Sequence, residues 1–182
     1  INTLHPSYGG PVQGVRGLST ELIRLGHSVS IATLDAPQSP WLEEWQPEIA
    51  ALGPALLSYR FQPRLVRWIR ANAHRFDAVI ANGTWRFSSL AVWLALRRSP
   101  VPYFIYSHGM LDPFFRHFPW KEAKKTVYWR IFEHRVFRDA RAVLFTCEQE
   151  RLGARNRYQP YQVREAVVRY GTTDAPPAAS DG

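Results

Sequence analysis

Short apolar runs bounded by turn-forming residues recur along the chain. They lie at residues 1–5, 28–34, 77–81, 103–107, 142–146 and 165–170. Short runs rich in apolar, β-branched and aromatic side chains are typical of strands buried on both faces of a parallel sheet. The pattern therefore predicts six strands. Residues 35–60 hold four prolines, so no long element is expected there, and whether residues 49–57 contain an irregular strand is left open.

Amphipathic segments separate these runs. In the first of them Val15, Leu18, Leu22 and Leu25 recur at three- and four-residue spacing, and Gly26 is suited to end the helix. Further helices are predicted at residues 63–76, 88–98 and 121–138 and from residue 148 onward. In the helix at 121–138 the buried face is expected to be Tyr128, Trp129, Phe132 and Val136. Strands that alternate with helices predict an α/β fold, a Rossmann-like parallel sheet with helices on both faces.

Length and composition bound the organisation of the chain. The 182 residues, 46% of them apolar, are enough for one domain with a substantial core. We expect this domain to span residues 1–171, followed by a small, polar, proline-rich linker at residues 172–182. No apolar run approaches the ~20 residues of a membrane-spanning helix. The single cysteine, Cys147, cannot form a disulfide within the chain, and no secretory signal is visible, so a cytoplasmic location is expected.

The formal charge of +8, supplied mostly by arginine, predicts partners that carry phosphate. Nucleic acid, an anionic membrane and phosphorylated metabolites all fit this charge. Zinc-ligand spacing, a helix-turn-helix pattern and an RNP-type strand are absent from the sequence, so a nucleic-acid partner is not expected.

The loops that follow the predicted strands carry the candidate functional residues. His108 and Gly109 come directly after the run at 103–107, and Asn82 and Trp85 follow the run at 77–81. In open parallel sheets, ligands bind outside the carboxyl ends of the strands, so these side chains are expected to lie near one another. His108 can equally be a core histidine that bonds to the backbone. Asn82 and Trp85 can be packing residues.

Two further strand ends offer ligand groups. Gly9 and Gly10 lead into the first helix, whose free N–H groups suit an anionic or hydroxyl-rich ligand, although the two glycines can also make a simple tight turn. Glu148 and Glu150 follow the run at 142–146. We favour helix-capping charges for this pair over a catalytic role.

The first glycine-rich loop is not a dinucleotide-binding fingerprint. Its glycines, at positions 10, 14 and 17, have the wrong spacing, and no acidic residue closes the second strand at the expected place. A hydride-transfer enzyme is therefore not expected.

Five segments together resemble a known family. They are PSYGGP at 6–11, LGHSV at 25–29, FDAVIANGTW at 76–85, PYFIYSHGMLDP at 102–113 and ARAVLFTCEQE at 140–150. In this order, and across nearly the whole chain, they resemble the N-terminal domain of glycosyltransferase family 4, whose enzymes have the two-domain GT-B architecture. Each segment alone is a weak signal, and the order of all five is a specific one.

The resemblance implies transfer of a sugar from a nucleotide-sugar donor to an acceptor hydroxyl, with retention of anomeric configuration and without a metal or other cofactor. It implies a sugar or lipid-linked acceptor and a role in bacterial polysaccharide or glycan biosynthesis. His108 is then the candidate catalytic residue. The candidate substrate-binding residues are Gly9, Gly10, Asn82, Trp85, Gly109, Glu148 and Glu150.

The chain also departs from the family pattern. In such enzymes a C-terminal domain with a paired-glutamate motif grips the donor nucleotide, so these 182 residues alone are expected to be inactive. The alternative interpretation is a non-catalytic ligand- or membrane-binding module of the same fold. Basic residues in the helix at 63–76, together with Lys121, Lys124 and Lys125 near Trp120, predict peripheral binding at the inner face of an anionic membrane.

Overall fold

The structure, a computed structural model, describes residues 1–111 and 119–169. Its centre is a parallel sheet of four strands in the order β3 (Val79–Asn82), β4 (Tyr103–Tyr106), β5 (Ala142–Phe145) and β6 (Glu165–Val167). A second parallel pair joins β1 (Ser30–Thr33) to β2 (Glu48–Ala51), with Ser30 opposite Glu48. The predicted α/β fold with parallel strands is confirmed.

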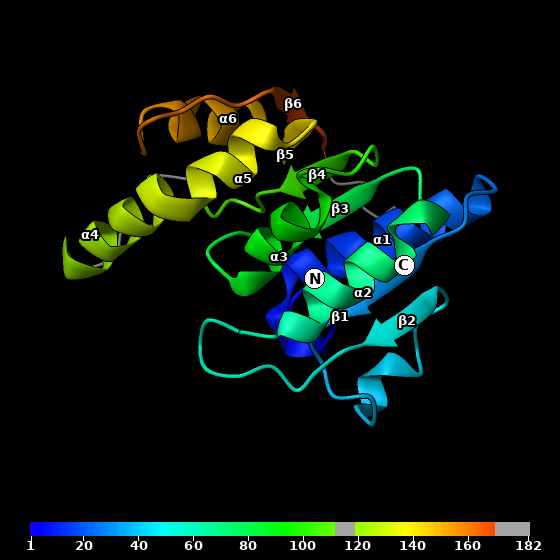
Figure 1. The fold of residues 1–182 in the computed structure, drawn as a ribbon. Coiled ribbons are helices and arrows are strands. Elements are labelled where there is room, and N and C mark those ends of the chain that lie inside the picture. The colour runs from blue at the N-terminus through cyan, green and yellow to red at the C-terminus, as the bar shows by residue number, and fades with distance from the viewer. Residues whose placement is uncertain (112–118, 170–182) are drawn as a thin grey trace, which may run out of the picture.

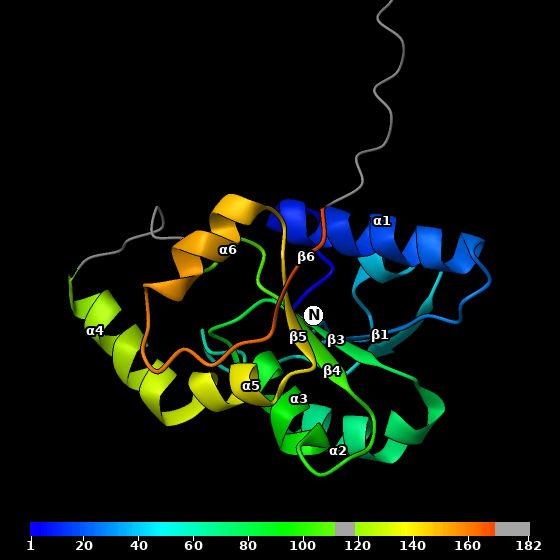
Figure 2. The same cartoon turned by 90° about the horizontal axis from the view of Figure 1, so that it is seen from above.

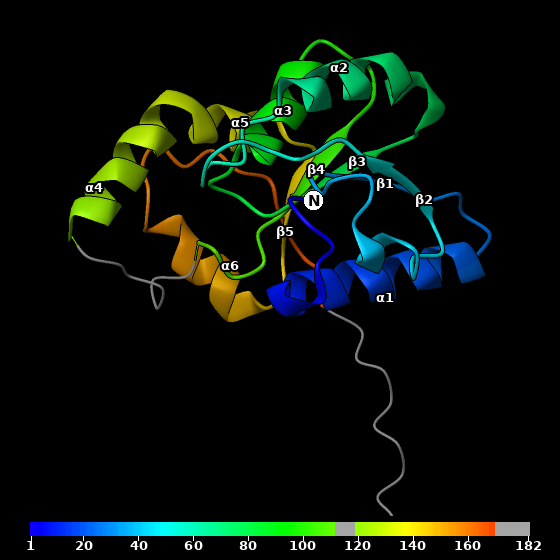
Figure 3. The ribbon, with the colours of Figure 1, turned by 90° about the horizontal axis from the view of Figure 1, so that it is seen from below.

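Helices cover both faces of the sheet. Figures 2 and 3 show α1 (Gly10–Arg24) and α6 (Glu148–Arg155) on one face, with α2 (Pro63–Asn72), α3 (Phe87–Leu96) and α5 (His134–Asp139) on the other. Helix α4 (Pro119–Tyr128) extends away from the sheet (Figure 1). Short 3₁₀ turns lie at Pro6–Tyr8, Pro40–Leu42 and Ala73–Arg75, and a π turn at Trp129–Glu133 joins α4 to α5. The expected two-sided layering is therefore present.

The core forms where the sheet meets its helices. Ile105 in β4 and Val143 and Phe145 in β5 are 0% exposed. Helix α3 is apolar around most of its surface and buries eight of its ten residues. Such a helix needs cover on several sides. It obtains that cover from β3, β4, α2 and α5, all of which it contacts.

One predicted strand is wrong. Residues 1–5 do not form a strand, and they are held instead by contacts to the end of β1. The amino group of Ile1 donates to the Ala32 carbonyl at 3.0 Å, and the Leu4 N–H donates to Oδ2 of Asp35 at 2.7 Å. The buried carboxylate of Asp35 accepts bonds that a neighbouring strand would otherwise take. The irregular region at 49–57 begins with the regular strand β2.

The predicted helix at 121–138 also needs correction. It is divided by the π turn, and Phe132, expected inside, is 40% exposed. Glu133 takes the inward position and is 0% exposed, as are Val136 and Phe137. The spacing from Trp129 to Glu133 to Phe137 is the regular four-residue step of a helix face. Hydrophobicity alone cannot assign a glutamate to that face.

The expected linker at residues 172–182 lies outside the described residues. In the described part of the chain, no helix has both the length and the apolar character needed to cross a bilayer.

Two glycines give a matched test of this packing. A Cβ at Gly53 would lie 2.1 Å from the Leu34 carbonyl oxygen and 2.6 Å from that of Asp35, both backbone atoms that cannot move aside. We expect Gly53→Ala to lower the free energy of unfolding by about 3 kcal/mol. Gly17 is exposed within α1 and a Cβ there meets nothing within 4 Å. Gly17→Ala should raise the same quantity by about 0.5–1 kcal/mol, as measured by urea unfolding. Equal effects of the two changes would contradict the packing described here.

Candidate functional site

A cleft of about 430 Å³ lies at the carboxyl ends of β3 and β4. It is bounded by the N-terminal segment, the start of α1, the loop after β3, the loop after β4, and single residues from two distant segments. The lining residues are Ile1, Asn2, Thr3, Tyr8, Pro11, Val12, Arg60, Asn82, Gly83, Thr84, Trp85, Arg86, His108, Gly109, Met110 and Lys125. The two strand-end loops predicted to lie together therefore share one cleft.

His108 is fixed in this cleft by its neighbours. Its Nε2 lies 3.0 Å from Oδ1 of Asn82, and its ring stacks on Tyr106 with centroids 4.6 Å apart. Burial lowers the pKa of His108 to about 4, against an opposing effect of the Glu150 carboxylate. The imidazole is therefore neutral at pH 7. With the Asn82 amide in this orientation Nε2 carries the proton and donates it to Oδ1, which makes Nδ1 the accepting nitrogen.

Trp85 is held by both packing and hydrogen bonds. Its indole Nε1–H donates to the Met110 carbonyl at 3.2 Å, and its ring packs edge-on against Tyr158 at 5.0 Å. The ring is half-buried and lines the cleft, with Nζ of Lys125 5.3 Å from its centroid. Trp85 thus joins the two loops and also forms part of the wall.

The candidate glycines occupy different places. Gly109, with φ of 76°, lines the cleft, and its N–H donates to Oε1 of Glu150 at 2.8 Å. Gly9, with φ of 62°, caps the start of α1, and Gly10 is the first residue of that helix. Neither Gly9 nor Gly10 lines the cleft, whereas their neighbours Tyr8 and Pro11 do. A contact of either glycine with an acceptor stays a prediction.

The two glutamates also separate. Both lie in the first turn of α6, and neither lines the cleft. Glu148 is exposed and pairs with Arg151. Glu150 is 2% exposed and binds Ser107, Gly109 and Thr146, residues of the loops that follow β4 and β5. Glu150 lies outside the cleft and therefore fixes the loop that carries His108 through hydrogen bonds to Ser107 and Gly109.

Three cations in the cleft were not among the predicted site residues. Arg86 follows Trp85 directly and could have been found by extending that motif by one residue. Arg60 and Lys125 come from segments distant in sequence from either strand end, and no local pattern marks them. Arg60, Trp85 and His108 are non-glycine residues with positive φ, at 60°, 62° and 50°. Such strained backbone tends to collect at ligand sites.

Glu133 is a buried carboxyl group behind the cleft. Its Oε1 accepts from the Trp85 N–H at 3.2 Å and from the Ser89 hydroxyl at 3.0 Å. Its Oε2 is buried and has no hydrogen-bond partner among the described residues. Burial raises the pKa of Glu133 to about 7, although these two bonds and the nearby Tyr128 hydroxyl oppose the shift. The side chain thus anchors the loop after β3 at an electrostatic cost above neutral pH.

A second cavity, of about 220 Å³, lies between β1 and β3 and is lined mainly by apolar side chains of α1, α2 and these strands. It lacks the convergent ionisable groups of the cleft, so we take the cleft as the candidate site. Among the described residues, no group of three or more His, Cys, Asp or Glu side chains is placed to hold a metal ion.

The comparison with protein families now decides the family. Residues 9–171 match the family model described as a glycosyl transferase 4-like domain. The chain belongs to this family. A search of curated proteins found no match. The resemblance inferred from the five segments is thereby confirmed. Family membership assigns the chain to sugar transfer in general, with a donor and an acceptor.

The carboxyl group of Glu133 should impose a pH dependence on this glycosyl transferase domain. A folded-state pKa of about 7, against 4.5 for the free group, means that the folded state binds the proton more tightly. The stability tied to the protonated group is complete below about pH 4.5 and is lost as the pH rises through about 7. Glu133→Gln should therefore be more stable than the unmodified protein at pH 8, by up to about 3 kcal/mol, and similar to it at pH 5.

Urea unfolding of both proteins at pH 5 and pH 8 measures this difference. Glu43→Gln is the matched control, because it makes the same chemical change at an exposed position. A gap between Glu133→Gln and the unmodified protein that does not change with pH would contradict the buried-acid interpretation.

Proposed function

We propose that this domain is the acceptor-binding half of a retaining glycosyltransferase, which moves a sugar from a nucleotide-sugar donor to an acceptor hydroxyl. The observation that carries the proposal is the neutral His108 at the end of β4, fixed by Asn82 and Tyr106 in the wall of the cleft. Family membership supports sugar transfer. The retaining outcome and the identity of the donor rest on the resemblance.

The geometry of His108 suits this reaction. Sugar transfer separates a phosphate leaving group from an oxocarbenium-like sugar, so polar groups that are already fixed can stabilise charge as it develops. The imidazole is neutral and is held in one orientation by Asn82 and Tyr106, so it is a fixed polar group that suits a hydrogen bond with a hydroxyl of the sugar or of the acceptor. We propose that His108 makes this contact and that Gly109 keeps the backbone clear of the ligand.

The remaining partners follow from the same proposal. The donor nucleotide binds mainly to a second domain, as the family architecture implies, so the 182 residues alone would bind acceptor without turnover. The acceptor is a sugar or a lipid-linked sugar of bacterial polysaccharide or glycan biosynthesis. Neither a metal nor another cofactor is required of this half.

His108→Ala in the full-length protein tests the proposal. We expect the transfer rate to fall by about 10² or more, because a fixed transition-state contact is lost. The thermal midpoint should stay within a few degrees. His27→Ala removes an exposed histidine outside the cleft and should change neither quantity.

A His108→Ala protein that melts much earlier but keeps normal activity per folded molecule would make His108 a core residue. A full-length protein that binds sugars without any transfer would favour the non-catalytic module instead.

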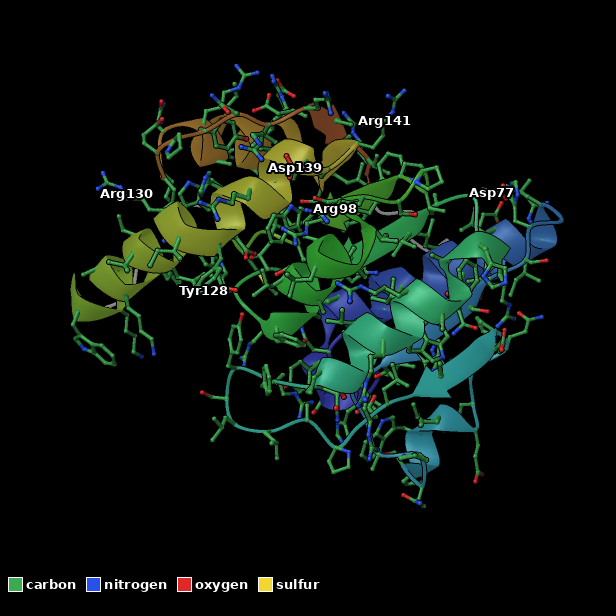
Figure 4. All side chains as sticks on the ribbon, in the orientation of Figure 1. Asp77, Arg98, Tyr128, Arg130, Asp139 and Arg141 are labelled. Carbon is green, nitrogen blue, oxygen red and sulfur yellow. The ribbon has the colours of Figure 1, made fainter. Side chains whose placement is uncertain are left out.

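Membrane docking is supported by one surface, the outer face of α4 and the π turn. Trp120, Val127 and Ile131 are 65%, 56% and 46% exposed and share this face at seven- and four-residue spacing. Lys121, Lys124 and Arg130 are also exposed on these turns, and Figure 4 shows Arg130 projecting away from the fold. Tryptophan with flanking cations is typical of helices that lie at a membrane interface.

Three of the other basic residues predicted for docking are engaged elsewhere. Arg70 donates to the Leu94 carbonyl, Arg75 pairs with Glu48, and Lys125 lines the cleft. We therefore narrow the proposed docking face to α4 and the π turn, at the inner face of the membrane.

Vesicle co-sedimentation at low salt tests this docking face. The domain should pellet with anionic vesicles more than with neutral ones, and each cation near the surface is worth about 1 kcal/mol. Trp120→Ala with Lys124→Glu should remove most of this binding. Arg98→Glu, which changes an exposed arginine at the far end of α3, should have a smaller effect. Equal binding to neutral and anionic vesicles would rule the proposal out.

A further inference from the structure

The candidate cleft has an unbalanced charge. Three of the sixteen described residues that line it are cations, Arg60, Arg86 and Lys125, and none of the sixteen is an aspartate or glutamate. Concave sites lined by one sign of charge concentrate ligands of the opposite sign. The lining therefore favours an anionic ligand, because none of the lining residues supplies a negative charge.

Arg60 gives the most direct evidence for a missing ligand, because part of its guanidinium group lacks a hydrogen-bond partner among the described residues. Its Nε is buried without a hydrogen-bond partner among the described residues, and its Nη2 makes only a long contact of 3.4 Å with the Asn2 carbonyl. Oδ1 of Asn2 is also buried and unpartnered within the described ranges. Buried polar groups in native proteins almost always have partners, so unmet groups in the wall of a cleft point to a ligand.

Arg86 and Lys125 are the other two cations that line the cleft. Arg86 is half-buried and forms no ion pair with any described residue. Lys125 is 3.8 Å from the nearest oxygen of Glu122, a weak pairing, and burial lowers its pKa. The first turn of α1, a 15-residue helix, also faces the cleft through Pro11 and Val12. The positive end of its dipole adds to the same field.

We propose that the cleft binds a phosphate group of a transfer substrate through Arg60, Arg86 and Lys125. Guanidinium groups match the oxygens of phosphate in paired hydrogen bonds, and lysine adds a point charge. A cleft of about 430 Å³ has room for a sugar beside the phosphate. The identification of the ligand as a substrate rests on the proposed transferase function, whereas binding of the anion does not. The phosphate belongs either to the acceptor or to the diphosphate of the donor.

Titration calorimetry with inorganic pyrophosphate and the 182-residue chain tests the anion site at about 50 mM salt. We expect binding that weakens about tenfold in Arg60→Gln and in Arg86→Gln, the loss for one charge-assisted contact. Arg86→Lys keeps the charge and should recover most of the affinity. Arg98→Gln is the matched control, because Arg98 is exposed, lies just beyond the C-terminal end of α3, and is not among the residues that line the cleft.

The proposal is overturned if pyrophosphate does not bind at millimolar concentration. It is also overturned if Arg98→Gln weakens binding as much as Arg86→Gln does. Circular dichroism of each variant confirms that it is folded before titration, and the Arg86→Lys variant separates lost charge from lost structure.

Steady-state kinetics of the full-length protein then identify the source of the phosphate. If the phosphate is the acceptor's, Arg86→Gln raises KM for a phosphorylated acceptor about tenfold and leaves KM for the donor unchanged. If the phosphate is the donor's, Arg86→Gln raises KM for the donor about tenfold and leaves KM for the acceptor unchanged. Transfer with both KM values unchanged overturns the assignment of the bound phosphate to a transfer substrate and leaves the proposed function intact. Pyrophosphate binding without any transfer removes the proposed function and leaves the anion site intact.

Discussion

The carboxylate of Glu150 joins the loop after β4, which carries His108, to the end of β5. Oε1 accepts from the Ser107 hydroxyl at 2.5 Å and from the Gly109 N–H at 2.8 Å, and Oε2 accepts from the N–H and the hydroxyl of Thr146. A buried carboxylate is costly unless its oxygens are hydrogen-bonded, and here both are. Since two of these donors flank His108 in the chain, the same bonds fix the backbone on which the imidazole stands. The left-handed conformation of His108 can persist because its surroundings over-determine it.

The same arrangement recurs at two other loops of the cleft. Asp35 holds the N-terminal segment through Thr3 and Leu4, and Glu133 holds the loop after β3 through the Trp85 N–H. Each acid lies behind the wall and bonds to the loop in front of it. The cleft is thus a set of irregular loops whose shape depends on buried acids rather than on strand pairing. The buried acids therefore hold these loops in place while their own side chains stay outside the cleft.

The sequence predicted the parts of this structure that follow from periodicity. Apolar runs located β1 and β3–β6, and their carboxyl ends placed Asn82 and His108 in one cleft. The same reasoning missed the features that depend on contacts between segments distant in sequence. Glu133 and Glu150 are charged residues that are buried because loops distant in sequence supply their donors. Residues 1–5 look like a strand, but Asp35 takes their hydrogen bonds. Arg60 and Lys125 come from segments distant in sequence from the other cleft residues, so only the tertiary fold places them at the cleft.

The positions of the charges also explain why the cleft stays electropositive in a domain with several acids close by. Glu133 and Glu150 lie behind the wall, and hydrogen bonds from backbone and hydroxyl groups occupy Oε1 of Glu133 and both oxygens of Glu150. An acid that accepts hydrogen bonds from neutral donors orders a loop without forming an ion pair with an arginine. Arg60 and Arg86 therefore keep their charge directed at the cleft rather than at a protein partner. The acids that order the loops are therefore separate from the cations that face the ligand. Because of this separation, the site is rigid and its lining carries a net positive charge.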